Sequence, residues 1–148
     1  MSEITMEEND KYDCLKLENQ LCFPLYAASR EVLKKYTPLL KELNLTYTQY
    51  IVMMVLWSEK EISIKELCRK LFLDTGTLSP MLKAMEKNGF LSRSRAKDDE
   101  RIVTVKITEK GEALREKAVA IPQKVGACLP LSSDDAKTLY EILYKILQ

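Results

Sequence analysis

The residues with the clearest chemistry are short hydroxyls and one cation in the stretch LDTGTLSPMLKAME. They are Thr75, Thr77, Ser79 and Lys83. In a helix they lie on the face opposite an apolar set at three- and four-residue spacing, made of Leu78, Met81, Leu82 and Met85. Because the polar face has no bulky side chain, such a helix can approach a DNA major groove and reach base edges and phosphates.

A charged hairpin is predicted directly after that helix. One strand covers 90–95, and its partner carries Ile102, Val103, Val105 and Ile107. The loop between them mixes four cations, Arg93, Arg95, Lys97 and Arg101, with the acids Asp98, Asp99 and Glu100. Purely non-specific phosphate binding would not favour those acids. We therefore expect at least one of them to form an ion pair that orients an arginine.

Local signals define the elements that position these side chains. Ser63 is expected to cap a helix while Glu66 reaches back to the cap amide. The residues LDTG end that helix, and Asn88-Gly89 ends the next, since this pair tolerates left-handed backbone geometry. Helix, turn, helix and hairpin over 61–108 form the pattern of a winged helix-turn-helix, which predicts DNA binding. The alternative is an ordinary α+β segment with a solvated hairpin.

Length and composition are consistent with a single domain. The chain has 148 residues, of which 46% are hydrophobic, enough to support a core. No run approaches the roughly 18 apolar residues of a membrane span. The acidic and polar residues 1–12 do not resemble a signal peptide, and we expect them to form a mobile tail. These features predict a cytoplasmic protein without a membrane partner.

Charge is distributed unevenly along the chain, although the net charge is only +1. Between Lys60 and Lys110, twelve Lys/Arg and eight Asp/Glu give +4, whereas the remaining 11 basic and 14 acidic residues give −3. Positive charge therefore gathers on the proposed DNA-binding lobe. A dimer would double this basic footprint.

Four cysteines and no histidine limit the chemistry that is available. Cys14, Cys22, Cys68 and Cys128 show no CxxC pairing. The usual zinc-ligand spacings are absent, so we expect no metal site and no cofactor. Histidine-dependent catalysis is excluded, and an enzyme is not indicated. A single cysteine on an apolar face is usually only a small core residue.

Apolar helices are predicted on both sides of the winged region. From about Leu15, six residues follow helical spacing: Leu17, Leu21, Leu25, Ala28, Val32 and Tyr36. Pro24 in this pattern predicts either a kink or a helix that starts near it. Tyr36-Thr37-Pro38 should disturb the helix, and a turn follows at Leu43-Asn44.

The remaining helices have recognisable starts. Thr46 and Gln49 predict a capping box for a helix from Tyr47 to about Ser58. Its expected core residues are Tyr50, Ile51, Met54, Val55 and Trp57. Thr108 should cap a helix that Pro122 interrupts or kinks, and Ser132 or Ser133 should cap a last helix with an apolar side of Leu139, Ile142, Leu143 and Ile146. Such apolar helices outside a small lobe suggest a second subunit.

Four long strings resemble the MarR family of winged-helix regulators, in particular its organic-hydroperoxide-sensing branch. They are LENQLCFPLYAASRE, NLTYTQY, LDTGTLSPMLKAME and DDERIV. The resemblance covers about 15–147. It implies a mainly α fold with a small β-wing and an obligate homodimer with interlocked N- and C-terminal helices. Within one chain of 1–148, it implies a DNA-binding lobe at 46–108 and dimerisation helices at 13–45 and 109–148.

The resemblance also implies roles for individual residues. Cys22 occupies the position of the peroxide-reactive cysteine, and Tyr36 and Tyr47 match two tyrosines that hydrogen-bond it from the partner subunit. Cys128 lies where the two-cysteine branch has its resolving thiol. Positions that meet DNA are Asp74, Thr75 and Thr77 at the start of the recognition helix, Arg93 and Arg95 on the wing strand, and Arg101 at the wing tip with its partner Asp99. Cys14 is expected to be incidental, and Cys68 to serve in packing.

Peroxide attack requires a thiolate, and Cys22 has no Lys or Arg within a helical turn. We expect it inside a helix rather than at its start, so the two phenols should stabilise the charged sulfur. Leu21, Phe23 and Leu25 would favour alkyl peroxides. The predicted function is a repressor that binds an inverted-repeat operator and releases it when organic hydroperoxides oxidise Cys22. The alternatives are control by a small phenolic ligand, a broader oxidative-stress or virulence regulator, and a thiol peroxidase.

Overall fold

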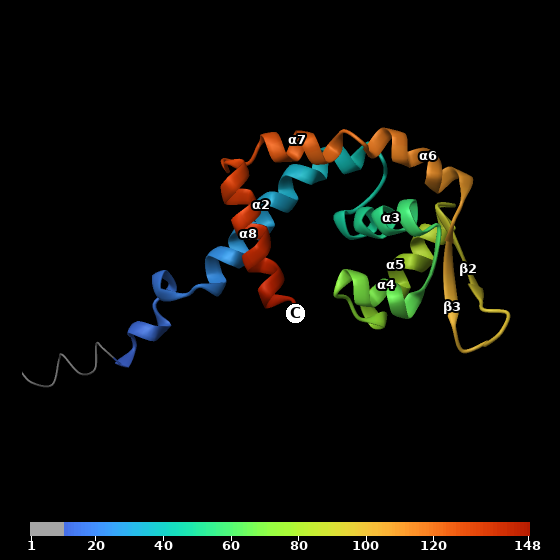
Figure 1. Cartoon of the computed structure of the whole chain (residues 1–148), viewed down its shortest axis with the longest axis horizontal. Helices are drawn as coiled ribbons and strands as arrows, with labels where there is room; N and C mark the ends of the chain where they lie inside the picture. Colours follow the sequence, from blue (N-terminus) through green and yellow to red (C-terminus); the bar gives the residue numbers. More distant parts are fainter. Residues whose placement is uncertain (1–10) are drawn as a thin grey trace, which may run out of the picture.

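The computed structural model describes residues 11–148, and the predicted mobile tail lies, except for Lys11 and Tyr12, outside these residues. Two parts are arranged as an arch (Figure 1). The arm contains η1 (Asp13–Leu15), η2 (Leu17–Asn19), α2 (Cys22–Lys41), α7 (Ile121–Ala127) and α8 (Ser133–Ile146). The winged lobe contains α3 (Tyr47–Glu59), β1 (Glu61–Ser63), α4 (Ile64–Leu71), α5 (Thr75–Lys87), β2 (Leu91–Arg95) and β3 (Val103–Ile107). The helix α6 (Glu109–Ala118) joins the two. The predicted fold class, mainly α with a small winged sheet, is confirmed.

The sheet has three antiparallel strands in the order β1-β3-β2. β2 and β3 form the predicted hairpin, with Arg93 opposite Val105 and Arg95 opposite Val103. The sequence did not indicate β1, because its three residues are too few to show an alternating pattern. It pairs with β3 at the start of α4 and so connects the wing to the helix-turn-helix.

The helix-turn-helix is defined by its caps. The Ser63 hydroxyl accepts a hydrogen bond from the Glu66 N–H at 3.2 Å, as predicted. The Glu66 carboxylate does not return to the cap amide as expected, because it pairs with Arg69 at 2.8 Å. α4 ends at Phe72 in the left-handed conformation, and Asp74 caps α5.

The core of the winged lobe is formed by apolar side chains from every element. Leu67, Leu78, Leu82, Met85 and Val105 are fully buried. In α3, Tyr50 and Trp57 are buried as predicted. The prediction for Met54 was wrong: it is 45% exposed, and the fully buried positions are Val52, Met53 and Leu56. α3 is apolar around most of its circumference, so its pattern could not show which face meets α4 and the sheet.

The first long helix starts near Pro24, which confirms one of the two predicted alternatives, and not at about Leu15. α2 begins at Cys22, and residues 13–19 form two short 3₁₀ turns. Pro24 is therefore the third residue of α2, where its missing N–H would have no partner within the helix in any case. The expected disturbance at Tyr36-Thr37-Pro38 was wrong, since α2 continues through Pro38 to Lys41. Packing holds this end in place, because Leu40 is 1% exposed and belongs to the core.

The C-terminal helices begin where their signals predict. Pro122 interrupts the apolar pattern, with α6 ending at Ala118 and α7 starting at Ile121. Ser132 and Asp135 form a capping box at the start of α8. No residue of α8 is buried within the chain. Within 11–148, no helix is both long and apolar enough to span a membrane.

Candidate functional site

A groove of about 450 Å³ lies between the start of α4, the start of α5 and the wing. Four of the predicted DNA-contacting residues line it: Thr75, Ser79, Arg93 and Arg101. The same groove contains Ser63, which was predicted only as a helix cap, and Lys65, which was not predicted as a site residue. Because Lys65 lies on the helix before the recognition helix, only the fold brings it to this face.

Asp74 and Thr77 form the N-terminal cap of α5. The Thr77 N–H donates to Asp74 Oδ1 at 2.7 Å, and the Thr77 hydroxyl donates to Asp74 Oδ2 at 3.1 Å. These two bonds hold the pKa of Asp74 below its ordinary value. The carboxylate is thus used to orient the start of the recognition helix.

Thr75 and Lys83 occupy the exposed face of α5. The Thr75 hydroxyl lies 3.8 Å from the Cys68 sulfur of α4. Lys83 lines a second groove, of about 540 Å³, together with Lys87, Glu86 and Arg93. The polar residues that were predicted on α5 therefore line two separate grooves.

The two wing-strand arginines differ in their surroundings. Arg93 is half-buried and bonded to Glu86 of α5, with Nε and Oε2 3.0 Å apart. Arg95 is exposed, and its guanidinium donates to the Glu100 carbonyl at 2.7 Å. These contacts could not be predicted, since Glu86 belonged to a different predicted element and no sequence signal joined it to Arg93.

The wing tip contains the ion pair that was predicted between an acid and an arginine. Asp99 Oδ1 accepts from Arg101 Nε at 3.2 Å and from the Arg101 backbone N–H at 3.0 Å. The Arg101 side chain is nevertheless 92% exposed. The prediction of an orienting acid is confirmed, and the guanidinium remains accessible.

Cys22 is the first residue of α2 and is exposed. This corrects the expectation that it lies inside a helix. The helix starts late because two 3₁₀ turns of three residues each, η1 and η2, precede it. The residues next to Cys22 in the sequence are apolar and their side chains are exposed: Leu21 is 83% exposed, Phe23 43% and Leu25 42%.

Tyr36 and Tyr47 lie together, with ring centroids 4.9 Å apart, and both contact Tyr50. Burial raises the pKa of both phenols, which therefore remain protonated hydrogen-bond donors at neutral pH. Tyr36 is fourteen residues beyond Cys22 on α2, or about 21 Å along the helix axis. Within one chain the structure does not bring either phenol to Cys22.

Cys128 is exposed at the C-terminal end of α7. All four cysteines have free thiols in this structure. Among residues 11–148, no group of three or more His, Cys, Asp or Glu side chains is arranged to hold a metal ion.

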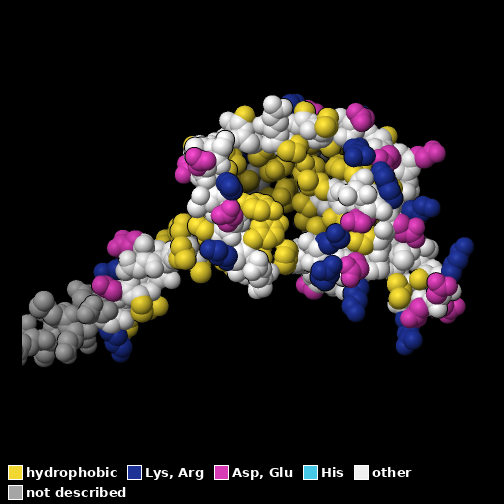
Figure 2. Space-filling model, viewed as in Figure 1, with side chains coloured by type: hydrophobic (Ala, Val, Ile, Leu, Met, Phe, Trp, Pro, Cys, Tyr) yellow, Lys and Arg dark blue, Asp and Glu magenta, His cyan; other side chains and the backbone are white. Residues whose placement is uncertain are grey.

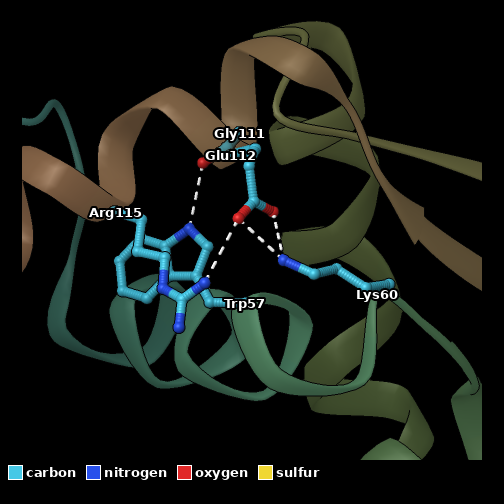
Figure 3. A network of polar contacts seen from close by, with 5 residues as sticks. All are labelled: Trp57, Lys60, Gly111, Glu112 and Arg115. Atoms are coloured by element: carbon cyan, nitrogen blue, oxygen red, sulfur yellow. Dashed lines mark hydrogen bonds and ion pairs between the residues drawn. The ribbon is translucent and has the colours of Figure 1, made fainter.

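A polar network attaches the start of α6 to the end of α3 (Figure 3). The Trp57 indole N–H donates to the Gly111 carbonyl at 3.0 Å. Glu112 accepts from Lys60 at 2.7 Å and pairs with Arg115 at 3.5 Å. The hydrogen bond from Lys60 is the main cause that lowers the pKa of Glu112. These contacts fix the first turns of α6 to the winged lobe.

Comparison with known proteins gave consistent matches. The family model described as "Transcriptional regulator SarA/Rot" matches residues 34–118. The organic hydroperoxide resistance transcriptional regulator of Bacillus subtilis is 48% identical over 139 residues, which cover 94% of this chain and 95% of the relative.

Solved structures of AbfR from Staphylococcus epidermidis are also similar. Reduced AbfR bound to DNA is 34% identical with a TM-score of 0.75, covering 94% of this chain and 96% of that chain. Disulfide-formed AbfR is 33% identical with a TM-score of 0.64, covering 95% of this chain and 99% of that chain. A MarR mutant from E. coli complexed with operator DNA is 25% identical with a TM-score of 0.75, covering 86% of this chain and 94% of that chain.

Proposed function

Because the chain belongs to the SarA/Rot family of MarR-type winged-helix transcriptional regulators, we propose that it represses transcription until an organic hydroperoxide oxidises Cys22. The repressor acts as a homodimer on an inverted-repeat operator. Cys128 of the partner subunit resolves the oxidised cysteine. The exposure of Cys22 at the first residue of α2, beside exposed apolar side chains, is the observation that carries the proposal.

DNA binding by the winged lobe is supported by the arrangement of α5 and the wing. α5 presents Thr75 and Lys83 to solvent, and Arg101 extends from the wing tip with 92% of its side chain exposed. A recognition helix in the major groove with a wing arginine in the adjacent minor groove fits this layout. The similar AbfR and MarR chains were solved with DNA.

A homodimer accounts for the apolar surface of the arm. Leu139, Tyr140, Ile142, Tyr144 and Ile146 of α8 are 42–62% exposed, and Leu21, just before α2, and Tyr26 of α2 are also exposed. Figure 2 shows hydrophobic side chains gathered over the arm and inside the arch. A surface this apolar on a water-soluble domain is typical of a subunit interface. Interlocked 13–45 and 109–148 segments would cover it.

The redox step is a two-electron oxidation of the Cys22 sulfur. The thiolate attacks the terminal oxygen of the hydroperoxide and the O–O bond breaks, so that the sulfur keeps the OH group as a sulfenic acid and the departing alkoxide takes a proton from water to become an alcohol. The start of a helix carries partial positive charge, which favours an anion at the position of Cys22. In a dimer, Tyr36 and Tyr47 of the other subunit can donate hydrogen bonds to the sulfur, since within its own chain Tyr36 lies about 21 Å along α2 from Cys22 and Tyr47 packs against Tyr36.

The resulting sulfenic acid then condenses with a second thiol. The sulfur of Cys128 from the partner subunit attacks the Cys22 sulfur, an S–S bond forms, and the sulfenic oxygen leaves as water. A disulfide requires Cα atoms within about 7 Å, so the arms must shift if the reduced thiols lie further apart. The present structure, with free thiols, has a higher TM-score with DNA-bound AbfR than with disulfide-formed AbfR, 0.75 against 0.64. This difference supports a conformational change on disulfide formation.

The experiment is release of a bound duplex by cumene hydroperoxide, with non-reducing electrophoresis of the same samples. Wild type should release DNA and form a cross-linked dimer. Cys22→Ser should bind DNA and release none of it, Cys128→Ser should form no cross-linked dimer, and Cys14→Ser should behave as wild type. Peroxide-driven release from Cys22→Ser equal to wild type would reject the thiol mechanism.

A second candidate, control by a small phenolic ligand, is favoured by one cavity. A cleft of about 350 Å³ between α3 and α6 is lined by Tyr50, Trp57, Arg115 and Val119, among others. Aromatic walls and a guanidinium suit an aromatic acid or phenol. Equal response of Cys22→Ser and wild type to such a ligand, with no response to peroxide, would favour this candidate.

A further inference from the structure

A single carboxylate joins the recognition helix α5 to the outer wing strand β2. Glu86 Oε1 accepts from the backbone N–H of Arg93 at 3.0 Å. Glu86 Oε2 accepts from Arg93 Nε and lies 3.0 Å from a terminal guanidinium nitrogen as well. Both acceptor oxygens are therefore committed to one residue. The same bonds hold the pKa of Glu86 below its ordinary value, so it remains ionised at neutral pH.

The position of Arg93 in the sheet explains the use of its backbone. β2 is an edge strand, because the order is β1-β3-β2. One side of an edge strand carries backbone N–H groups with no strand partner. Glu86 satisfies one of these groups and holds the guanidinium at the same time. The last turns of α5 are thus tied to the middle of β2 at a fixed distance.

This geometry separates Arg93 from the other arginines of the wing. The Arg93 side chain is 29% exposed and that of Glu86 36%, whereas Arg101 is 92% exposed. A guanidinium that already pairs with a carboxylate has less charge available for a phosphate. Arg101 also has an acidic partner, but of its guanidinium only Nε contacts Asp99, at 3.2 Å, and 92% of the side chain remains exposed.

We infer that Glu86 is a positioning residue for DNA recognition, and that Arg93 is its structural partner rather than a phosphate ligand. The pair sets the distance between the recognition helix in the major groove and the wing in the minor groove. This inference rests on the proposed DNA-binding function. It corrects the expectation that Arg93 meets DNA directly.

The test is duplex affinity as a function of salt concentration, by fluorescence anisotropy, on a duplex selected from a random pool by wild type. Each phosphate contact adds about one to the slope of log K against log salt. Arg101→Ala should lower this slope by about one. Arg93→Ala and Glu86→Ala should each weaken binding roughly tenfold and leave the slope unchanged, because a loosened wing costs affinity without removing a phosphate contact. Arg95→Ala, on the same strand, is the matched control for loss of a cation without loss of the tie.

Removal of an acid near DNA normally strengthens binding, so the sign of the Glu86→Ala effect is decisive. The double variant Glu86→Ala/Arg93→Ala should bind no worse than either single variant, since both changes break one unit. If Glu86→Ala does not fold, Glu86→Gln replaces it in the test. This variant keeps an acceptor for the Arg93 N–H and should bind with an affinity between those of wild type and Arg93→Ala. A slope lowered by Arg93→Ala, or tighter binding by Glu86→Ala or Glu86→Gln, would overturn the inference while leaving the proposed function intact. Failure of wild type to select any duplex would overturn both.

Discussion

The residues of the DNA-binding face perform two different tasks. Thr75, Lys83 and Arg101 present polar side chains to solvent, whereas Asp74 and Thr77 use theirs on each other at the start of α5. Residue type alone does not distinguish these tasks, because a threonine or an aspartate is equally suited to a cap and to a base edge. The hydrogen-bond partners make the distinction.

The cap at Asp74 leads to a pH prediction. Folding lowers the pKa of Asp74 from its ordinary 3.8, so its stabilising contribution is present above that value and is lost as the pH falls through the folded pKa. Wild type should therefore be more stable than Asp74→Asn near neutral pH, and this difference should vanish at about pH 2. Urea unfolding of both proteins across this range measures it. Asparagine has the same shape and does not titrate, so a difference that is independent of pH would contradict the account.

At the scale of elements, α6 is attached to the winged lobe by close packing. A Cβ atom on Gly111 would lie 2.1 Å from the Phe90 carbonyl oxygen and 3.1 Å from Met53 Cε. Only glycine permits this approach, which also places the Gly111 carbonyl next to the Trp57 indole N–H (Figure 3). The residues 119–120 separate α6 from α7, and Ala118 and Ile121 on either side of them pack into the same core.

Gly111→Ala should destabilise the protein by about 1–3 kcal/mol, since backbone must shift to admit the methyl group. Gly126→Ala is the matched control, because nothing lies within 4 Å of its would-be Cβ. In the helix α7 that change should be neutral or should stabilise by roughly 0.5 kcal/mol. The free energy of unfolding from urea titration compares the two, and equal effects would show that the close contact at Gly111 has no energetic importance.

At the scale of the whole molecule, the arm exposes a large apolar surface in the single chain. α8 has no buried residue in one chain, yet it is amphipathic and properly capped. The core of the winged lobe also takes in residues of the arm, such as Leu40 of α2 and Val125 of α7. The proposed dimer would therefore cover only the outer, apolar surface of the arm, which Figure 2 shows.

Ile142→Glu should dissociate the dimer, because it places a charge in the centre of the apolar face of α8, where Ile142 is 48% exposed in one chain. Light scattering after gel filtration should show a protomer mass, and duplex affinity should fall with it. Lys137→Glu lies on the opposite side of α8 and should leave the dimer intact. A dimer that survives Ile142→Glu would place the interface elsewhere.

Much of the fold was determined by local sequence. The caps at Thr46, Ser63 and Ser132 were confirmed, since capping depends on residues within one helical turn. The recognition helix and the hairpin also followed from short-range periodicity. The start of α2 near Pro24 was one of two predicted alternatives, and sequence alone left both open because an apolar pattern continues upstream of Cys22 through residues that are exposed in the chain.

By itself, the sequence determined the helix-turn-helix, the wing and the presence of an acid–arginine ion pair in the wing, because these depend on neighbours in the chain, whereas the candidate cysteines and the Asp99–Arg101 pairing came from the resemblance to a family. Only the tertiary structure decided that Arg93 binds Glu86, that Lys65 joins the groove of Thr75 and Arg101, and that Cys22 begins a helix remote from Tyr36. Those relations join residues from separate elements or depend on where a helix stops being stabilised by packing. Sequence spacing contains no record of such distances.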